Sequence, residues 1–306
     1  MNNNRFFGKG ILTLLSRITG LSSRGDKTPT NEIHYTTADN SVLTIKKLSY
    51  FGKGQIVSNK NVCILKFDKD VTEIGGDAFW GCSSLTSITI PESVTEIGEG
   101  AFNRCSSLTS ITIPPSVTEI GSCAFYGCKS LTSITIPPSV TEIGNRAFAW
   151  CSSLTNISVS KDNKVYDSRE ECNAIIHTES NTLISGCENT IIPPSVTKIG
   201  DAAFSGCKSL TRISIPPSVT EIGEYAFFGC SSLTSIFIPP SVTKIGISAF
   251  SYCINLTNIT IPESVTEIRE WTFSHCSSLT EVRIPKGCYV HGSAFWNCPK
   301  VKIIRY

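Results

Sequence analysis

One unit of about 23 residues recurs along most of this 306-residue chain. The sequence of this unit is nearly constant: IPESVTEIGEGAFNRCSSLTSIT at 90–112, IPPSVTEIGSCAFYGCKSLTSIT at 113–135 and IPPSVTEIGNRAFAWCSSLTNIS at 136–158. Units aligned on Ile-Pro begin at Phe67, Ile90, Ile113, Ile136, Ile192, Ile215, Ile238, Ile261 and Ile284. A fixed period of this length is typical of a solenoid. Because one coil cannot bury its own apolar face, repetition is how such a chain builds a core.

Each unit predicts two extended segments and one corner. In 108–113 branched residues alternate with polar ones, as in a half-buried strand, and one such strand per coil predicts a stacked parallel sheet. Pro114 and Pro115 end that strand because they lack the amide hydrogens of a ladder. The stretch 117–120 is a second short extended segment. About two turns of helix or 3₁₀ helix are then predicted from the helical spacing of Ala124, Phe125, Cys128 and Leu131.

Two columns of residues should run along the stack. The first is expected to be a continuous spine of Phe79, Phe102, Phe125, Phe148, Phe204, Phe227, Phe250, Phe273 and Phe295. The second comprises Cys82, Cys105, Cys128, Cys151, Cys207, Cys230, Cys253, Cys276 and Cys298. A metal array or a chain of disulfides is the alternative for these thiols. Zinc sites need close pairs in a tetrahedral cage, so we expect small buried hydrophobes instead.

The repeat also resembles a known family. The order Leu108-x-x-Ile111-x-Ile113-x-x-Ser116 resembles the general leucine-rich repeat, and the whole unit is similar to the BspA-like leucine-rich repeat family of surface proteins. The resemblance implies a right-handed leucine-rich repeat solenoid with parallel strands on the concave face and short helical or extended segments opposite. It also implies an N-terminal β cap, with a hairpin turning at 38–41.

The period divides the chain into five parts. They are a leader at 1–30, which is a degenerate signal peptide or disordered, the cap at 31–66, four coils at 67–158, an island at 159–191, and five coils at 192–306. The island is expected to be a distended coil carrying a hairpin, 174–176 against 182–184. A last strand is expected at 302–306.

Composition restricts the partners. A net charge of +2 lacks the dense positive field that nucleic-acid binding needs. No window of about 18 apolar residues is present, so no transmembrane helix is expected. Arg24 stands where a bacterial lipoprotein signal would have its lipid-carrying cysteine. Export is therefore an open question in the sequence, with a cell-surface or secreted location expected and a cytoplasmic one as the alternative.

Chemistry has few candidates in this sequence. Phosphate-loop, dinucleotide and zinc-protease motifs are missing and the four histidines are scattered, so we expect no catalytic residue, metal or cofactor. Cys172 and His177, supported by Asp167, are the nearest approach to a nucleophile and base, which leaves a hydrolase at the island as a third function. Cys172 and Cys187 flank the island hairpin and are candidates for a disulfide if the chain is exported.

Two surfaces are candidates for protein binding. Outward strand positions are Ser or Thr in the first coils but change later, which gives a concave patch of Arg212, Phe237, Asn258, Glu281 and Arg283. Aromatic residues and arginine contribute strongly to interfaces, whereas the alternative is drift on a solvated sheet. The lateral surface comprises Trp80, Tyr126, Trp150, Tyr225, Phe228, Tyr252 and Trp271, which either pack half-buried or bind a partner.

One repeat position carries charge. It holds Glu73, Glu96, Glu119, Glu142 and Glu221, and also Lys198 and Lys244. Calcium loops need closer acidic spacing, so we expect a solvated column.

The expected function is a non-enzymatic protein-binding solenoid. The family resemblance adds an adhesin-like role toward host or neighbouring-cell proteins, with matrix or surface proteins as the ligand class. The alternative is an intracellular or injected interaction scaffold. Fold alone does not choose between them.

Overall fold

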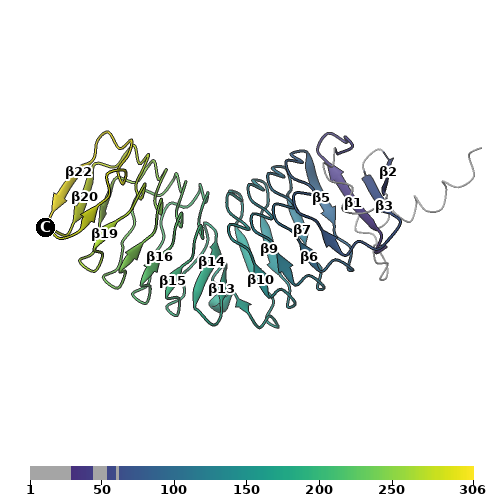
Figure 1. The fold of residues 1–306 in the computed structure, drawn as a ribbon, viewed down its shortest axis with the longest axis horizontal. Helices are drawn as coiled ribbons and strands as arrows, with labels where there is room; N and C mark the ends of the chain where they lie inside the picture. Colours follow the sequence, from purple (N-terminus) through teal and green to yellow (C-terminus); the bar gives the residue numbers. More distant parts are fainter. Residues whose placement is uncertain (1–28, 44–53, 60–61) are drawn as a thin grey trace, which may run out of the picture.

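The computed structural model describes residues 29–43, 54–59 and 62–306. Over these residues the chain is a solenoid of stacked coils, which confirms the predicted fold class. Figure 1 shows two runs of coils that meet at β13 (Ala174–His177) and β14 (Thr182–Gly186) in a bent arc. Most of the proposed leader lies outside the described residues.

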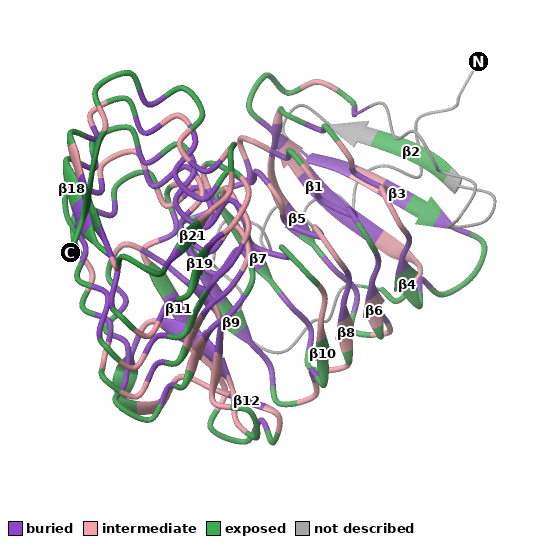
Figure 2. Cartoon of the chain, turned by 60° about the vertical axis from the view of Figure 1, so that its left-hand side comes forward, coloured by how far each residue is buried: buried purple, intermediate pink, exposed green. Residues whose placement is uncertain are grey.

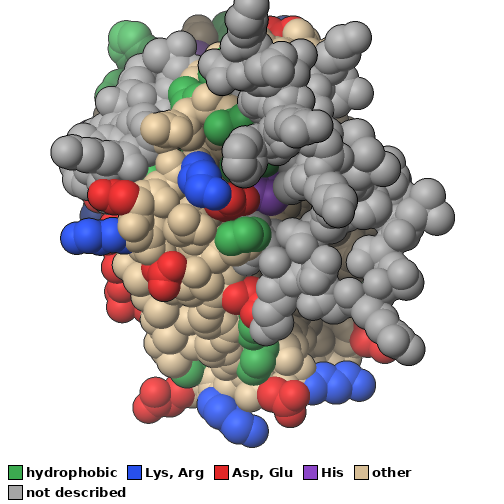
Figure 3. Space-filling view, turned by 90° about the vertical axis from the view of Figure 1, so that its right-hand side faces the viewer, with side chains coloured by type: hydrophobic (Ala, Val, Ile, Leu, Met, Phe, Trp, Pro, Cys, Tyr) green, Lys and Arg blue, Asp and Glu red, His purple; other side chains and the backbone are tan. Residues whose placement is uncertain are grey.

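Three strands cover the amino-terminal end of the stack. They are β1 (Glu32–Thr37), β2 (Gly54–Asn59) and β3 (Val62–Phe67). The sheet order is β2-β3-β1-β5-β7, with β1 antiparallel to both β3 and β5. Tyr35 of β1 pairs with Cys63 of β3 on one side and with Ile88 of β5 on the other, so both edges of β1 are occupied there. Charged side chains of both signs are scattered over the described surface in the view of this end (Figure 3), and Lys66 Nζ lies 3.0 Å from Glu32 Oε1.

The prediction of a hairpin that turns at 38–41 is therefore wrong, because β1 pairs with β3 and β5 rather than with the segment after the turn. A turn is present, because Asn40 N donates to Thr37 O at 3.3 Å. The neighbours of β1 are β3 and β5, which come from farther along the chain. Residues 44–53, which would continue such a hairpin, lie outside the described residues.

Two strand faces follow the stack. The long-strand face contains β5 (Leu85–Thr89), β7 (Ser110–Thr112), β9 (Ser133–Ile136), β11 (Asn156–Val159), β18 (Asn258–Thr260), β20 (Glu281–Ile284) and β22 (Lys302–Arg305). The short-strand face contains β4 (Glu73–Ile74), β6 (Glu96–Ile97), β8 (Glu119–Ile120), β10 (Glu142–Ile143), β15 (Lys198–Ile199), β16 (Glu221–Ile222), β17 (Lys244–Ile245), β19 (Glu267–Ile268) and β21 (Tyr289–Val290). Within both faces the paired coils run parallel, and β22 confirms the predicted last strand.

The third side of each coil is a corner segment, 98–105 in the second coil, and it is not a helix. Phe102 N donates to Ala124 O of the next coil at 2.7 Å, and Arg104 N donates to Tyr126 O at 2.7 Å. The N–H groups between them close turns within the coil. Arg104 has φ 60°, in the left-handed region. Helical spacing misled the prediction because these amides bond between coils. Among the described residues the helical segment is η2 (Arg169–Glu171), a 3₁₀ turn in the island.

The apolar interior follows the whole stack (Figure 2), but the phenylalanine spine is not continuous. Rings of Phe79, Phe102, Phe125 and Phe148 stack at 5.3–5.4 Å, and those of Phe204, Phe227, Phe250, Phe273 and Phe295 at 5.2–5.4 Å. Among the described aromatic contacts none joins Phe148 to Phe204. The buried residues accordingly form two clusters, one in each run.

The island separates these runs. β12 (Tyr166–Asp167) and β14 both pair antiparallel with β13, so the predicted hairpin is present. β14 then pairs parallel with β15 and joins the second run. The island strands thus extend the short-strand sheet of the second run, in the order β12-β13-β14-β15-β16-β17, and lie between the fourth and fifth repeated coils.

Candidate binding surfaces

Three residues of the expected patch lie together on the long-strand face. Asn258 in β18 pairs with Glu281 in β20, and Arg283 is two residues farther along β20. Arg283 Nε lies 3.8 Å from Glu281 Oε1. Residues i and i+2 of a strand point to the same side, so these side chains share one surface.

Phe237 and Arg212 extend this surface toward the island. Phe237 forms a parallel bridge with Ser214, and its side chain is 71% exposed. Arg212 lines an open hollow of about 430 Å³ beside Ile191, which is 76% exposed. Sequence reasoning missed Ile191. The available signal was its position before Ile-Pro, where an earlier coil has Thr112.

Part of the expected lateral surface is a cluster around Phe228. The Phe228 ring centroid lies 5.8 Å from that of Tyr225, 5.3 Å from that of Tyr252 and 6.0 Å from that of Trp150. The rings are tilted or edge-on to one another, the arrangement that aromatic quadrupoles favour. Packing between coils accounts for this cluster.

Other lateral residues lie elsewhere on the same edge. Trp80 and Tyr126 line an open hollow of about 630 Å³ with Arg104, whose guanidinium lies 6.0 Å from the Trp80 ring centroid. Trp271 instead packs edge-on against Trp296, with ring centroids 6.0 Å apart. Trp150 also lines the hollow of Trp80 and Tyr126, so this hollow continues into the Phe228 cluster, whereas Trp271 packs separately against Trp296.

Trp150 connects the two runs of coils. Its N–H donates to Ser205 O at 2.8 Å. A Cβ added at Gly206 would lie 2.6 Å from Trp150 Cα, and one at Gly229 would lie 3.0 Å from Trp150 Cη2. These glycines leave the room that the tryptophan occupies, so Trp150 bridges from the fourth repeated coil to the fifth and sixth.

The charged column on the short-strand face has a different character in each run. Burial, and then the neighbouring carboxylates of Glu96 and Glu142, raise the pKa of Glu119. Although burial alone would raise it, hydrogen bonds from Lys244 and Lys198 lower the pKa of Glu221. Among the described residues no group of three His, Cys, Asp or Glu side chains is placed to hold a metal ion.

The repeated cysteines are free thiols, all buried except the half-buried Cys207, and from Cys105 onward they donate to a carbonyl of the preceding segment of the stack. Cys105 Sγ lies 3.1 Å from Phe79 O, and Cys128 Sγ lies 3.2 Å from Phe102 O. Burial raises the pKa of Cys128 to about 12. The thiol therefore stays protonated and donates a weak hydrogen bond. Cysteine suits this position because its side chain is small and apolar and its S–H group can donate that bond.

The island thiols Cys172 and Cys187, which are candidates for a disulfide if the chain is exported, are not joined. Ala174 pairs with Gly186, so Cys172 and Cys187 are one residue out of register and turn to opposite faces of the hairpin. Cys172 belongs to the second core cluster and Cys187 to the first. Both are free thiols.

The structure likewise gives no nucleophile and base at the island. Burial raises the pKa of Cys172 to about 11. His177 Nδ1 lies 3.0 Å from Ser180 Oγ, and Asp167 binds Arg169 at 2.7 Å. Each group is thus engaged elsewhere, and a buried neutral thiol is a poor nucleophile.

Comparison with known proteins identifies the family. The model of the BspA type leucine rich repeat region matches residues 37–173 and 180–302. The chain belongs to this family. The BspA-type match covers both runs of coils and confirms the resemblance noted in the repeat. No helix among the described residues has the length and apolar character needed to cross a membrane.

Solved structures of bacterial proteins share this fold. A leucine rich cell surface protein from Faecalibacterium prausnitzii A2-165 is 36% identical with TM-score 0.70, and the match covers 78% of this BspA-type chain and 64% of that protein. A leucine-rich repeat protein from Eubacterium ventriosum ATCC 27560 is 28% identical with TM-score 0.66, covering 78% and 71%. This chain thus spans less than two thirds of the Faecalibacterium protein. The curated proteins gave no match.

Proposed function

We propose that this chain is a non-enzymatic, adhesin-like binding protein that acts at a cell surface or in secreted form. Its ligands are proteins of a host or of neighbouring cells. The family match and the 36% identity to a bacterial cell surface protein support this location. A solenoid offers an extended surface for recognition at many points.

The observation that carries the proposal is the exposure of Phe237. A phenylalanine 71% exposed on a strand face gains nothing for the fold, yet a partner that covered it would bury a large apolar ring. Arg212, Asn258, Glu281 and Arg283 supply polar groups beside it. An apolar anchor with arginine nearby is the usual composition of an interface centre. We call these five residues the strand patch.

The lateral edge is a second surface for the same function. The hollow of Trp80, Tyr126 and Arg104 is open, and its arginine lies over an aromatic ring. We rank it below the strand patch because its aromatic rings are only half exposed.

One observation favours an intracellular or injected scaffold as the alternative. All fourteen cysteines are free thiols, as in a protein kept in a reducing compartment. Protease shaving of intact source cells, followed by mass spectrometry of the released peptides, separates the two. Repeat peptides released from intact cells support the surface location, whereas full protection until lysis favours the scaffold.

The binding role is tested with the labelled protein on fixed host epithelial cells. A quadruple variant, Arg212, Phe237, Glu281 and Arg283 each to Ala, should lose at least about tenfold in apparent affinity, as expected when an interface centre is removed. The matched control replaces Ser110, Thr112, Ser133 and Thr135 by Ala on the first run. Equal affinity of the two variants would refute the strand patch.

A further inference from the structure

The corner segments form a directional ladder along each run. Their N–H groups point toward the next coil, whose carbonyls accept them: Cys123 N donates to Asn145 O at 2.9 Å, and Phe125 N to Ala147 O at 2.8 Å. The pattern breaks where the island replaces the next coil. In the hydrogen bonds of the described residues, neither Arg146 N nor Phe148 N has an acceptor.

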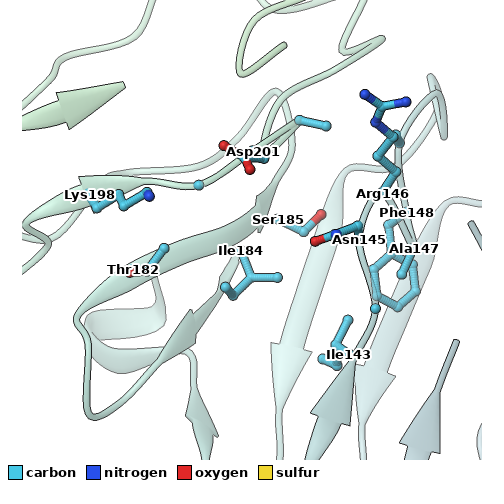
Figure 4. A pocket seen from close by; sticks show the side chains of 14 residues that line it. Ile143, Asn145, Arg146, Ala147, Phe148, Thr182, Ile184, Ser185, Lys198 and Asp201 are labelled. Atoms are coloured by element: carbon cyan, nitrogen blue, oxygen red, sulfur yellow. The ribbon is translucent and has the colours of Figure 1, made fainter. Parts of the chain in front are cut away.

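These two amides face a pocket at the junction of the runs. The pocket has a volume of about 200 Å³ and lies between 143–149 on one side and β14 with 198–202 on the other (Figure 4). Trp150 N, bonded to Ser205 O at 2.8 Å, closes the ladder again beyond it. Unpaired backbone amides beside a pocket need a partner, because leaving them unsatisfied is costly.

A buried hydroxyl points into the same space. Ser185 as a whole residue is 7% exposed, and its hydroxyl, which borders the pocket, has no hydrogen-bond partner within the described residues. In Figure 4 its oxygen is directed toward Asn145, whose side-chain amide is also without a bond. Three donors therefore lie at the pocket, two backbone amides and one hydroxyl, and the Asn145 side chain lies beside the hydroxyl.

Charged residues of both signs line the pocket: Arg146, Lys198 and Asp201. Arg146 has φ 58°, and its guanidinium carbon lies 4.5 Å from the Tyr225 ring centroid. Asp201 lines the pocket with one carboxylate oxygen, Oδ1, accepting from Glu224 N at 2.9 Å, and its negative charge limits the site to an anion held away from it by the amides. The two unpaired amides alternate with that of Ala147, which donates to Gly144 O at 3.3 Å, and backbone N–H groups that converge on one concavity can bind an anion.

We propose that this junction pocket, defined by Asn145, Arg146, Phe148 and Ser185, binds a small oxyanion, either a carboxylate or a phosphate. The anion accepts from the amides of Arg146 and Phe148 and from Ser185, and the Arg146 guanidinium, which stacks on Tyr225, adds a positive charge at the rim of the pocket. A peptide strand does not fit the gap, because Gly186 N already donates to Ala203 O at 2.8 Å. The bound anion would connect the two runs at the place where the hydrogen-bond ladder between successive coils is interrupted.

Calorimetric titration of the full chain with sodium phosphate and with sodium acetate, at constant ionic strength, tests the site. Ser185→Ala and Arg146→Gln should each weaken binding by about fivefold or more, as for loss of a donor or a charge at an oxyanion. The matched control is Arg104→Gln. Arg104 also has a left-handed φ and lies over an aromatic ring, but its amide donates to Tyr126 O at 2.7 Å.

The involvement of the backbone amides can be observed directly through their NMR signals. In protein labelled with [15N]arginine, the Arg146 amide signal should shift during the anion titration, while that of Arg104 stays in place. Whether phosphate or acetate binds more tightly identifies the anion type. Absence of binding by both anions would overturn the proposal, as would an equal loss in Arg104→Gln or an unmoved Arg146 amide. Circular dichroism of each variant confirms that the fold is retained.

Discussion

The two runs of coils have separate cores of the same construction but differ in their short-strand faces. In the first run Glu73, Glu96, Glu119 and Glu142 stand directly opposite one another along β4, β6, β8 and β10. In the second run Lys198 and Lys244 flank Glu221, with nitrogen-to-oxygen distances of 3.2 and 2.9 Å. The same repeat position is thus repulsive on one side of the island and attractive on the other.

The long-strand faces differ as well. In the first run the outward positions are short hydroxyl side chains, such as Ser110 and Thr112, whereas the second run has Phe237, Glu281 and Arg283. Ring stacking in the two cores is nearly identical, at 5.3–5.4 and 5.2–5.4 Å. The interior is held constant while the surface varies, so a specific partner has more to recognise on the second run.

The separation of the cores predicts the largest effect. Phe125 and Phe250 are both fully buried, one in each run. We expect Phe125→Ala or Phe250→Ala to lower the free energy of unfolding by about 3–5 kcal/mol, because each leaves a ring-sized cavity in a stack. Hydrogen exchange should increase in the altered run and stay protected in the other. Equal loss of protection in both runs would show that the cores act as one.

The junction predicts a smaller effect with a matched control. Gly206 has φ 78° and an added Cβ would collide with Trp150, whereas Gly81 has φ 72° and open space around it. Both alanine variants should lose about 1–2 kcal/mol for the left-handed conformation. Gly206→Ala should lose about 1–3 kcal/mol more from the collision, measured by urea unfolding. Similar midpoints for the two variants would argue against the Trp150 bridge.

Much of this fold is predictable from the period alone. The strands, the last strand and the island hairpin follow from alternation, proline and repeat length, which are local in the sequence. The corner segment was missed because its apolar residues also match helical spacing. A usable signal was present in Gly81, Gly127, Gly206 and Gly229, which share a position with positive φ. In other coils Arg104 and Trp150 occupy this position, so the glycine pattern is incomplete in the sequence.

The candidate sites were harder to foresee. The strand patch could be found because its residues depart from the repeat, and departures are visible in one sequence. The junction pocket could not, because it depends on which amides of 146–148 lose their acceptors once the island is placed. The exclusion of a Cys172–Cys187 disulfide required the register of β13 on β14, which spacing leaves undefined.

The charge columns predict the smallest effect, and it has opposite signs in the two runs. At neutral pH, Glu119→Gln should stabilise the first run by a few tenths of a kcal/mol, because like charges directly opposite are destabilising. Glu221→Gln should destabilise the second run by about 0.5–1 kcal/mol, the range of partly exposed ion pairs. Both differences should shrink in high salt, which screens such contacts.

Acid pH separates the two columns further. The pKa of Glu119 is raised in the folded state, so the chain gains stability there as pH falls through that raised value and the repulsion disappears. The pKa of Glu221 is lowered, so its contribution is present above the ordinary glutamate pKa and is lost as pH falls through the lowered value. Thermal unfolding of wild type and both variants from pH 7 to pH 3 measures this. As pH falls, two differences in stability should disappear in order. First, at a higher pH, wild type becomes as stable as Glu119→Gln. Then, at a lower pH, wild type is no longer more stable than Glu221→Gln. The reverse order would mean that the columns do not interact as their registers imply.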